Sequence, residues 1–209
     1  MKQILWLLLL SLALPMAAFA SSVDFTNSQG TLSGTDAGLS LSGSTLIAVN
    51  GLAGLGLVTG NLGTVEFSTA ALSSGSLAMG GTFGAGGTFM VTSNGTGGLP
   101  AGVIFNGSFT GPVSWTLTTL ANGTHNYMLS GALSGTWYTG ATVFGATVQL
   151  TINTGKGFFA GATQISSGDT NITTAPEPGS LTLLGTLLGI GGILLKKRHS
   201  SGSLSSTSP

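Results

Sequence analysis

Apolar and polar residues alternate along much of the middle of the chain. Val113, Trp115 and Leu117 fall on one face of an extended segment, and Ser114, Thr116 and Thr118 fall on the other. The segment 146–152 repeats this pattern, with apolar residues at the even positions and threonine or glutamine at the odd ones. A period of two with one apolar face is typical of an antiparallel strand whose outer face meets water.

Short turn signals separate these alternating runs. Asn122-Gly123 lies between the first run and a second one at 124–133, and this dipeptide is a strong hairpin signal. Asn-Gly also occurs at residues 50, 94 and 106, where we expect further turns. The remaining strand candidates are 44–49, 63–69, 87–92, 102–105 and 137–144.

These elements predict an all-β fold, an antiparallel β-sandwich or a barrel-like ectodomain. The part from 21 to 87 is richer in glycine and serine and less regular, so strand register is weakly specified there. No amphipathic helix is expected between the two ends of the chain. A β-solenoid is disfavoured because no fixed repeat of about 20–50 residues is found.

Composition narrows the function classes. Charged residues make up 5% of the chain, which has 36 glycines and no cysteine. Thiol catalysis and cysteine-based metal sites are therefore excluded. Between 21 and 174 the charged side chains are four carboxylates and one lysine: Asp24, Asp36, Glu66, Asp169 and Lys156. Binding of nucleic acid needs several basic residues to neutralise phosphates, so no nucleic-acid partner is expected.

The first 20 residues have the pattern of a secretory signal peptide. Lys2 gives a positive start, 4–14 is an apolar segment, and Ala18 and Ala20 fit the small-x-small rule for cleavage. Cleavage is expected after Ala20, which leaves a domain that starts at residue 21.

A second apolar segment lies near the C-terminus. Residues 179–195 contain no charge, and at about 1.5 Å per residue they would form a helix of roughly 26 Å. That length is at the lower limit for a transmembrane helix. Lys196, Lys197 and Arg198 follow directly and are expected to stay on the cytoplasmic side. Both ends thus predict the same topology, with 21–174 exported.

The C-terminal segment resembles a known sorting signal. Pro176, Glu177 and Pro178 precede the apolar helix and the basic cluster, and this order of three parts resembles the PEP-CTERM sorting segment. The same type of segment is also labelled after ice-binding proteins that carry it. The resemblance implies a Gram-negative bacterium with an extracellular polysaccharide, and recognition of the Pro-Glu-Pro element by exosortase, a membrane enzyme that removes the tail.

The chain is therefore expected to have four parts. They are a signal peptide (1–20), a Gly/Ser/Thr-rich β domain (21–174), the sorting segment (175–198) and a tail of disorder-like composition (199–209). We expect a precursor held in the cytoplasmic membrane by one helix, then a protein of the cell surface or extracellular matrix. A structural or adhesive, non-enzymatic role is predicted, with a carbohydrate-binding module as the alternative.

Few residues of the middle suggest chemistry. His125 is the one histidine between the two ends and is read as an exposed residue at the start of a strand. Glu66 with Asp36 or Asp24 could form the carboxylate pair of a glycosidase, but the sequence does not bring them together. Asp36 and Asp169 resemble turn residues. No catalytic, cofactor or metal site is predicted.

The aromatic residues offer one binding hypothesis. Trp115 shares a face with valine and leucine and is expected in the core. Trp137 and Tyr138 are adjacent, so in a strand they would point to opposite faces and one of them could meet a glycan. They are the candidate contacts to extracellular polysaccharide.

Overall fold

The computed structural model describes residues 21–174, which form thirteen strands and two short 3-10 turns. The elements are β1 (Ser21–Ser28), β2 (Thr31–Thr35), β3 (Gly38–Asn50), η2 (Leu52–Gly54), β4 (Val58–Ser68), β5 (Leu72–Ser76), β6 (Gly80–Phe83), β7 (Gly86–Asn94), η3 (Thr96–Gly98), β8 (Ala101–Phe109), β9 (Val113–Thr119), β10 (His125–Trp137), β11 (Thr142–Asn153), β12 (Ala162–Gln164) and β13 (Ser167–Thr174). The prediction of an all-β antiparallel fold is confirmed.

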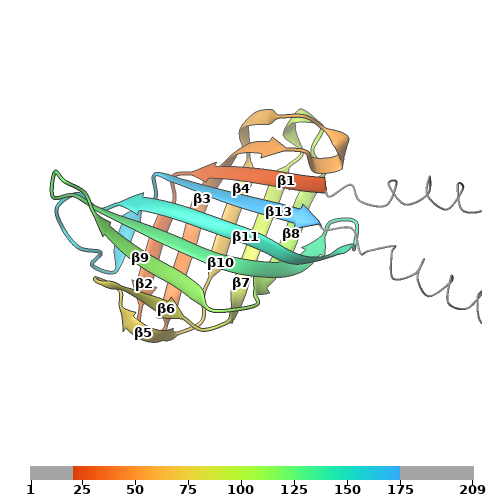
Figure 1. The fold of residues 1–209 in the computed structure, drawn as a ribbon. Helices are drawn as coiled ribbons and strands as arrows, with labels where there is room; N and C mark the ends of the chain where they lie inside the picture. The colour runs from red at the N-terminus through yellow and green to blue at the C-terminus, as the bar shows by residue number, and fades with distance from the viewer. Residues whose placement is uncertain (1–20, 175–209) are drawn as a thin grey trace, which may run out of the picture. The chain divides into compact units, whose positions relative to one another are not determined.

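Eight strands close into a barrel (Figure 1). Going round, the order is β1, β3, β4, β7, β8, β10, β11 and β13, so each barrel strand pairs with the next one along the chain. The ring is completed by β13 and β1, which pair antiparallel from Ser21 opposite Thr174 to Asn27 opposite Gly168. The sequence was compatible with either a sandwich or a barrel. The structure is a barrel, because the pairing of β13 with β1 closes the ring and leaves no barrel strand with a free edge along it.

The barrel splits at one end, where β2, β5, β6 and β9 gather (left in Figure 1). The first half of β10 pairs with β9 and its second half with β8, while β3 pairs in the same way with β2 and then β1. The outer strands then pair further out, β9 with β6 and β2 with β12. Thus β1–β2 and β8–β9 each behave as one long strand that bends away from the ring.

The two halves of the barrel have the same topology. Strands β1, β2, β3, β4, β6 and β7 correspond in order to β8, β9, β10, β11, β12 and β13. The pairing of β6 with β9 is matched by that of β12 with β2, and β5 is an insertion in the first half. Matched strands are separated by similar distances in the chain: β1 starts at Ser21 and β8 at Ala101, β7 at Gly86 and β13 at Ser167. The domain therefore repeats one topology at a spacing of about 80 residues, longer than the repeats of about 20–50 residues typical of solenoids.

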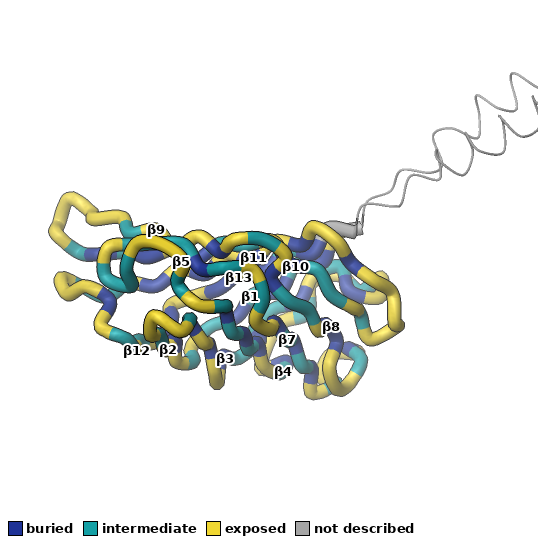
Figure 2. Tube along the Cα trace, turned by 90° about the horizontal axis from the view of Figure 1, so that it is seen from below, coloured by how far each residue is buried: buried dark blue, intermediate teal, exposed yellow. Residues whose placement is uncertain are grey.

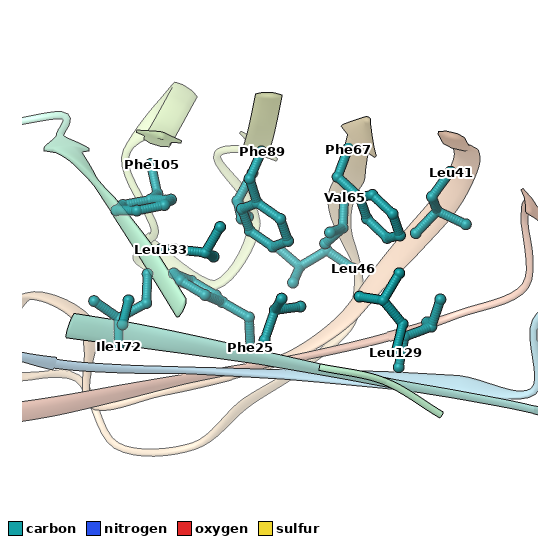
Figure 3. Close-up of a cluster of buried hydrophobic side chains, with 14 of the residues drawn as sticks. Phe25, Leu41, Leu46, Val65, Phe67, Phe89, Phe105, Leu129, Leu133 and Ile172 are labelled. Carbon is teal, nitrogen blue, oxygen red and sulfur yellow. The ribbon is translucent and has the colours of Figure 1, made fainter. Parts of the chain in front are cut away.

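The core fills the inside of the ring. Phe67, Phe89 and Phe105 point inward from β4, β7 and β8, and meet Phe25 from β1 and Leu133 from β10 (Figure 3). The Phe89 ring packs edge-on against Phe105 at 6.1 Å and parallel to Phe67 at 6.2 Å. Along the strands, buried positions alternate with exposed ones (Figure 2). The sequence period of two thus sets which side chains fill the barrel.

An aromatic cluster closes the split end. Trp115, expected in the core, is 1% exposed and stacks on Tyr127 with ring centroids 4.9 Å apart. The Trp115 indole donates to the carbonyl of Leu77 at 2.8 Å. The Tyr127 hydroxyl donates to the carbonyl of Ala78 and accepts from the backbone N–H of Phe159 at 3.0 Å. Two loops, 77–79 and 154–161, are tied to the core at this point.

Several local predictions were wrong. Asn106-Gly107 lies inside β8 rather than in a turn, because Gly107 pairs opposite Gly135 and a side chain there would strike the backbone of Ser134. The predicted strand 137–144 is interrupted by a hairpin turn: Trp137 ends β10, residues 138–141 form the turn, and 142–144 begin β11. A bond from the N–H of Trp137 to the carbonyl of Ala141 at 2.9 Å closes the turn. The part from 21 to 87 contains six strands, more than the sequence pattern indicated, but the pairings of β1 with β3, β3 with β4 and β5 with β6 all have register shifts.

Other local predictions are confirmed. Asn122-Gly123 forms the turn between β9 and β10, and Asn-Gly at 50 and 94 ends β3 and β7.

Within residues 21–174, no helix is long and apolar enough to cross a membrane. The predicted signal peptide with its cleavage site, the sorting motif, the predicted transmembrane segment 179–195 and the basic cluster lie outside the described residues.

Candidate functional site

A polar hollow lies on the outer wall of the barrel, over β11, β13, β1 and β3. It encloses about 410 Å³ and has eight lining residues. Seven of them are polar, and Leu57 is the exception. The lining is Asp24, Thr26, Asn50, Leu57, Thr147, Gln149, Asp169 and Asn171. We call this site the polar hollow.

Strand register places these side chains in two rows. In one row Thr147, Asn171, Asp24 and Asn50 are opposite one another across the four strands. In the next row Gln149, Asp169 and Thr26 are opposite one another. All of them occupy the outward positions of their strands, because the residues between them point into the core. The rigid ladder therefore holds the carboxylates, amides and hydroxyls at fixed positions.

The two carboxylates of the polar hollow are Asp24 and Asp169. They are diagonal neighbours across β1 and β13, a relation that places Cα atoms roughly 7–8 Å apart. The Asn171 side-chain amide donates to Asp24 Oδ1. No basic side chain lines the hollow, and Lys156, the one basic residue of 21–174 apart from His125, lies in the turn after β11. The site is thus acidic and rich in hydrogen-bonding groups.

A second hollow lies at the rim of the barrel, next to the first. It encloses about 260 Å³. Its lining is Val23, Gly51, Leu52, Ala53, Gly54, Trp137, Tyr138 and Thr139. The turn 51–57 separates the two hollows: its start lines this rim hollow, and Leu57 at its end lines the polar hollow.

The rim hollow contains the aromatic pair predicted to contact a glycan. Trp137 is half-buried and packs against Phe105 at 5.5 Å and Phe25 at 6.0 Å, so its ring belongs partly to the core. Tyr138 is 43% exposed, and its N–H is bonded to the carbonyl of Ile104 at 3.0 Å. The expectation that one of the two residues is exposed is confirmed for Tyr138, but the predicted reason is wrong. Tyr138 lies in the turn after β10 and not in a strand, and both residues line the same hollow.

His125 is not the exposed residue that the sequence suggested. It is 8% exposed, its ring stacks on Phe158 at 4.3 Å, and its Nδ1 lies 3.0 Å from Thr119 Oγ1. The loop after β11 folds back over the start of β10 through a bond from the His125 N–H to the carbonyl of Gly155. This cover, contributed from 30 residues further along the chain, cannot be read from the turn that precedes His125.

The carboxylates considered for catalysis are placed apart. Glu66 lies in β4, and Asp36 lies in the turn between β2 and β3. Neither of them lines the polar hollow that contains Asp24. The carboxylate that lines the polar hollow together with Asp24 is Asp169, which lies in β13 and not in a turn as expected. Among residues 21–174 no three acidic or histidine side chains are close enough together to hold a metal ion.

Comparisons of the chain with protein-family models, curated protein sequences and solved structures found no match. The likeness of the C-terminal segment to a sorting signal therefore remains a prediction from its residues. The argument about function depends on the two hollows and on the outer wall of the barrel.

Proposed function

We propose that the protein is an exported, non-enzymatic component of a bacterial surface or extracellular matrix, in which the barrel has a structural or adhesive role. The two ends of the chain support export and sorting to the surface. The first is a predicted signal peptide ending at Ala20, and the second is Pro176, Glu177 and Pro178 before an apolar segment and a basic cluster. Exosortase and the cytoplasmic membrane are the proposed partners of the precursor, and extracellular polysaccharide is that of the delivered protein.

The observation that carries this proposal is a continuous polar row on the outer wall. Ser114, Ser130, Gln149, Asp169 and Thr26 are opposite one another in register across five neighbouring strands, β9, β10, β11, β13 and β1. All five point outward and are exposed or half-exposed. Hydroxyl and amide groups both donate and accept hydrogen bonds, so such a wall can contact a hydrated polymer directly or through water.

The low charge of the barrel fits the same role. Its wall is hydrated by serine, threonine, asparagine and glutamine, and not by lysine and glutamate. Contacts of this type are individually weak and are not strongly screened by salt, unlike contacts between charges. Many of them in parallel would hold the protein in a polymer layer while the closed ring keeps its shape.

The test is fractionation of the producing cells. The protein is measured in cytoplasm, membrane, growth medium and the polysaccharide layer released by mild shear, with an antibody against the barrel. We expect most of it in the polysaccharide layer, and release into the medium when polysaccharide synthesis is blocked. Recovery chiefly from the cytoplasm, or the same distribution with and without the polysaccharide, would refute the proposal.

A specific carbohydrate-binding module is the second candidate, favoured by Trp137 and Tyr138 in the rim hollow. Aromatic rings provide apolar faces that can pack against sugar rings, with polar groups nearby. The test substitution is Tyr138→Ala, because Trp137 also packs into the core. The matched control is Phe144→Ala, which removes a 72% exposed ring outside both hollows. Loss of retention on the host polysaccharide in the Tyr138 variant alone supports this candidate, and equal retention of all forms contradicts it.

A further inference from the structure

We propose that the polar hollow binds an amino sugar, a hexose ring that carries a protonated amine, as one unit of a polysaccharide chain. This inference rests on the proposed function for its biological setting, but the binding itself is tested on the purified protein. It concerns Asp24 and Asp169, which the rim hollow does not include.

The first argument is charge. Asp24 and Asp169 lie on adjacent strands with no basic side chain lining the hollow around them. Two carboxylates in one concave site produce a negative potential that attracts a cationic group. An ammonium group would interact favourably with both, whereas a uronate would be repelled. The expected ligand is therefore a cation.

The second argument is the rest of the lining. Asn50, Gln149 and Asn171 add amides, and Thr26 and Thr147 add hydroxyls. Amides and hydroxyls recognise a ligand with several hydroxyl groups, which a simple alkylamine does not have. The volume of about 410 Å³ is in the range of small-molecule sites and is far larger than a single ion needs. An amino sugar combines one cationic group with several hydroxyl groups and fits this lining.

The third argument comes from the other half of the barrel. Strands β4, β7 and β8 correspond to β11, β13 and β1, and register identifies the equivalent positions. The position equivalent to Asp169 is Met90, which pairs with Asn106 as Asp169 pairs with Thr26. The position equivalent to Asp24 is Val103, which pairs with Thr92 as Asp24 pairs with Asn171. Both carboxylates are thus replaced by apolar residues on the equivalent wall. The barrel scaffold does not require acids at these positions, so they are available for recognition.

The experiment measures binding of three hexasaccharides to the full-length protein by calorimetry. The probes are a hexamer of glucosamine, the same hexamer with N-acetyl groups, and a hexamer of galacturonate. A polyoxyethylene detergent is used because sugar-based detergents would compete. We expect the glucosamine hexamer to bind tightest and the galacturonate hexamer weakest. Affinity for the glucosamine hexamer should fall as salt is raised from about 0.05 to 0.5 M, because salt screens exposed charges.

The double substitution Asp24→Asn and Asp169→Asn removes both charges and keeps the size of the side chains. It should raise the Kd for the glucosamine hexamer about fivefold to tenfold, the effect of two exposed ion pairs, and abolish the preference over the acetylated probe. The matched control is Glu66→Gln, which removes a carboxylate from β4, outside the hollow, at the position equivalent to Gln149. This control should bind as the unsubstituted protein does.

Two outcomes overturn the inference: equal binding of the glucosamine and acetylated hexamers, or an equal loss of affinity in the control and the double variant. The second outcome would mean that the overall charge of the protein, and not the hollow, attracts the ligand. Failure here is distinguishable from failure of the proposed function, which depends on where the protein is found in cells. A correctly delivered protein that binds none of the three probes would refute only the amino-sugar site.

Discussion

The hydroxyl of Tyr127 links the core to both loops at the split end of the barrel. Tyr127 is 0% exposed, and its hydroxyl bridges the carbonyl of Ala78 and the N–H of Phe159. The substitution Tyr127→Phe removes this one oxygen. The ring that stacks on Trp115 is kept, so packing changes little.

The expected loss follows from the two backbone groups that lose their partner. A buried polar group without a hydrogen bond costs about 1–3 kcal/mol. Partial relaxation of the loops lets water reach one of the groups, so we expect the free energy of unfolding to fall by about 2–4 kcal/mol. For a domain of this size, that corresponds to a fall in Tm of about 5–15 °C.

Two measurements test this prediction. Urea unfolding of the purified protein gives the change in free energy, and hydrogen exchange followed by mass spectrometry should show faster exchange in 77–79 and 154–161 before the rest of the barrel. The control is Tyr138→Phe, which removes the hydroxyl of a tyrosine that is 43% exposed. A change below about 0.5 kcal/mol for Tyr127→Phe, or unchanged exchange in both loops, would refute the role given to this hydroxyl.

Three further substitutions test the bends and the core. Gly30→Ala should lower the free energy of unfolding by at least about 1–3 kcal/mol more than the control Gly123→Ala. Both glycines have left-handed φ angles. A Cβ at Gly30 would lie 2.6 Å from the backbone N of Ser44, whereas a Cβ at Gly123 would meet open space. Asn27→Ala should cost about 1–3 kcal/mol, because it breaks the buried 2.7 Å bond to the Ser44 hydroxyl, and a double-mutant cycle with Ser44→Ala should show the coupling. Phe89→Ala should cost about 3–5 kcal/mol in urea unfolding, and a loss below about 1 kcal/mol would contradict its central place in the core.

Periodicity was sufficient to predict the strands with the clearest alternation. The pattern over 146–152 gave the inward face of β11, and Asn122-Gly123 gave the turn before β10. These signals are local, so the sequence displays them directly. Asn106-Gly107 shows the limit: the same dipeptide lies in mid-strand because the opposing backbone leaves no room for a side chain at Gly107.

The closure of the ring and the polar hollow could not be predicted in the same way. Asp24 and Asp169 come together only because β1 pairs with β13 across almost the whole length of the domain. The repeated topology of the two halves could not be predicted either, because residues at matched positions, such as Asp169 and Met90, have unlike side chains. Both the ring closure and the polar hollow depend on pairing between strands that are far apart in the chain.

The most direct test of the central claim, that this chain is a barrel delivered by a sorting tail, is the intact mass of the protein recovered from its host. We predict that the protein begins at Ser21 and that, in cells with exosortase, it lacks the basic cluster ending at Arg198. In a strain without exosortase the chain should extend through Arg198 and stay in the membrane fraction. The same C-terminus in both strains would contradict the account.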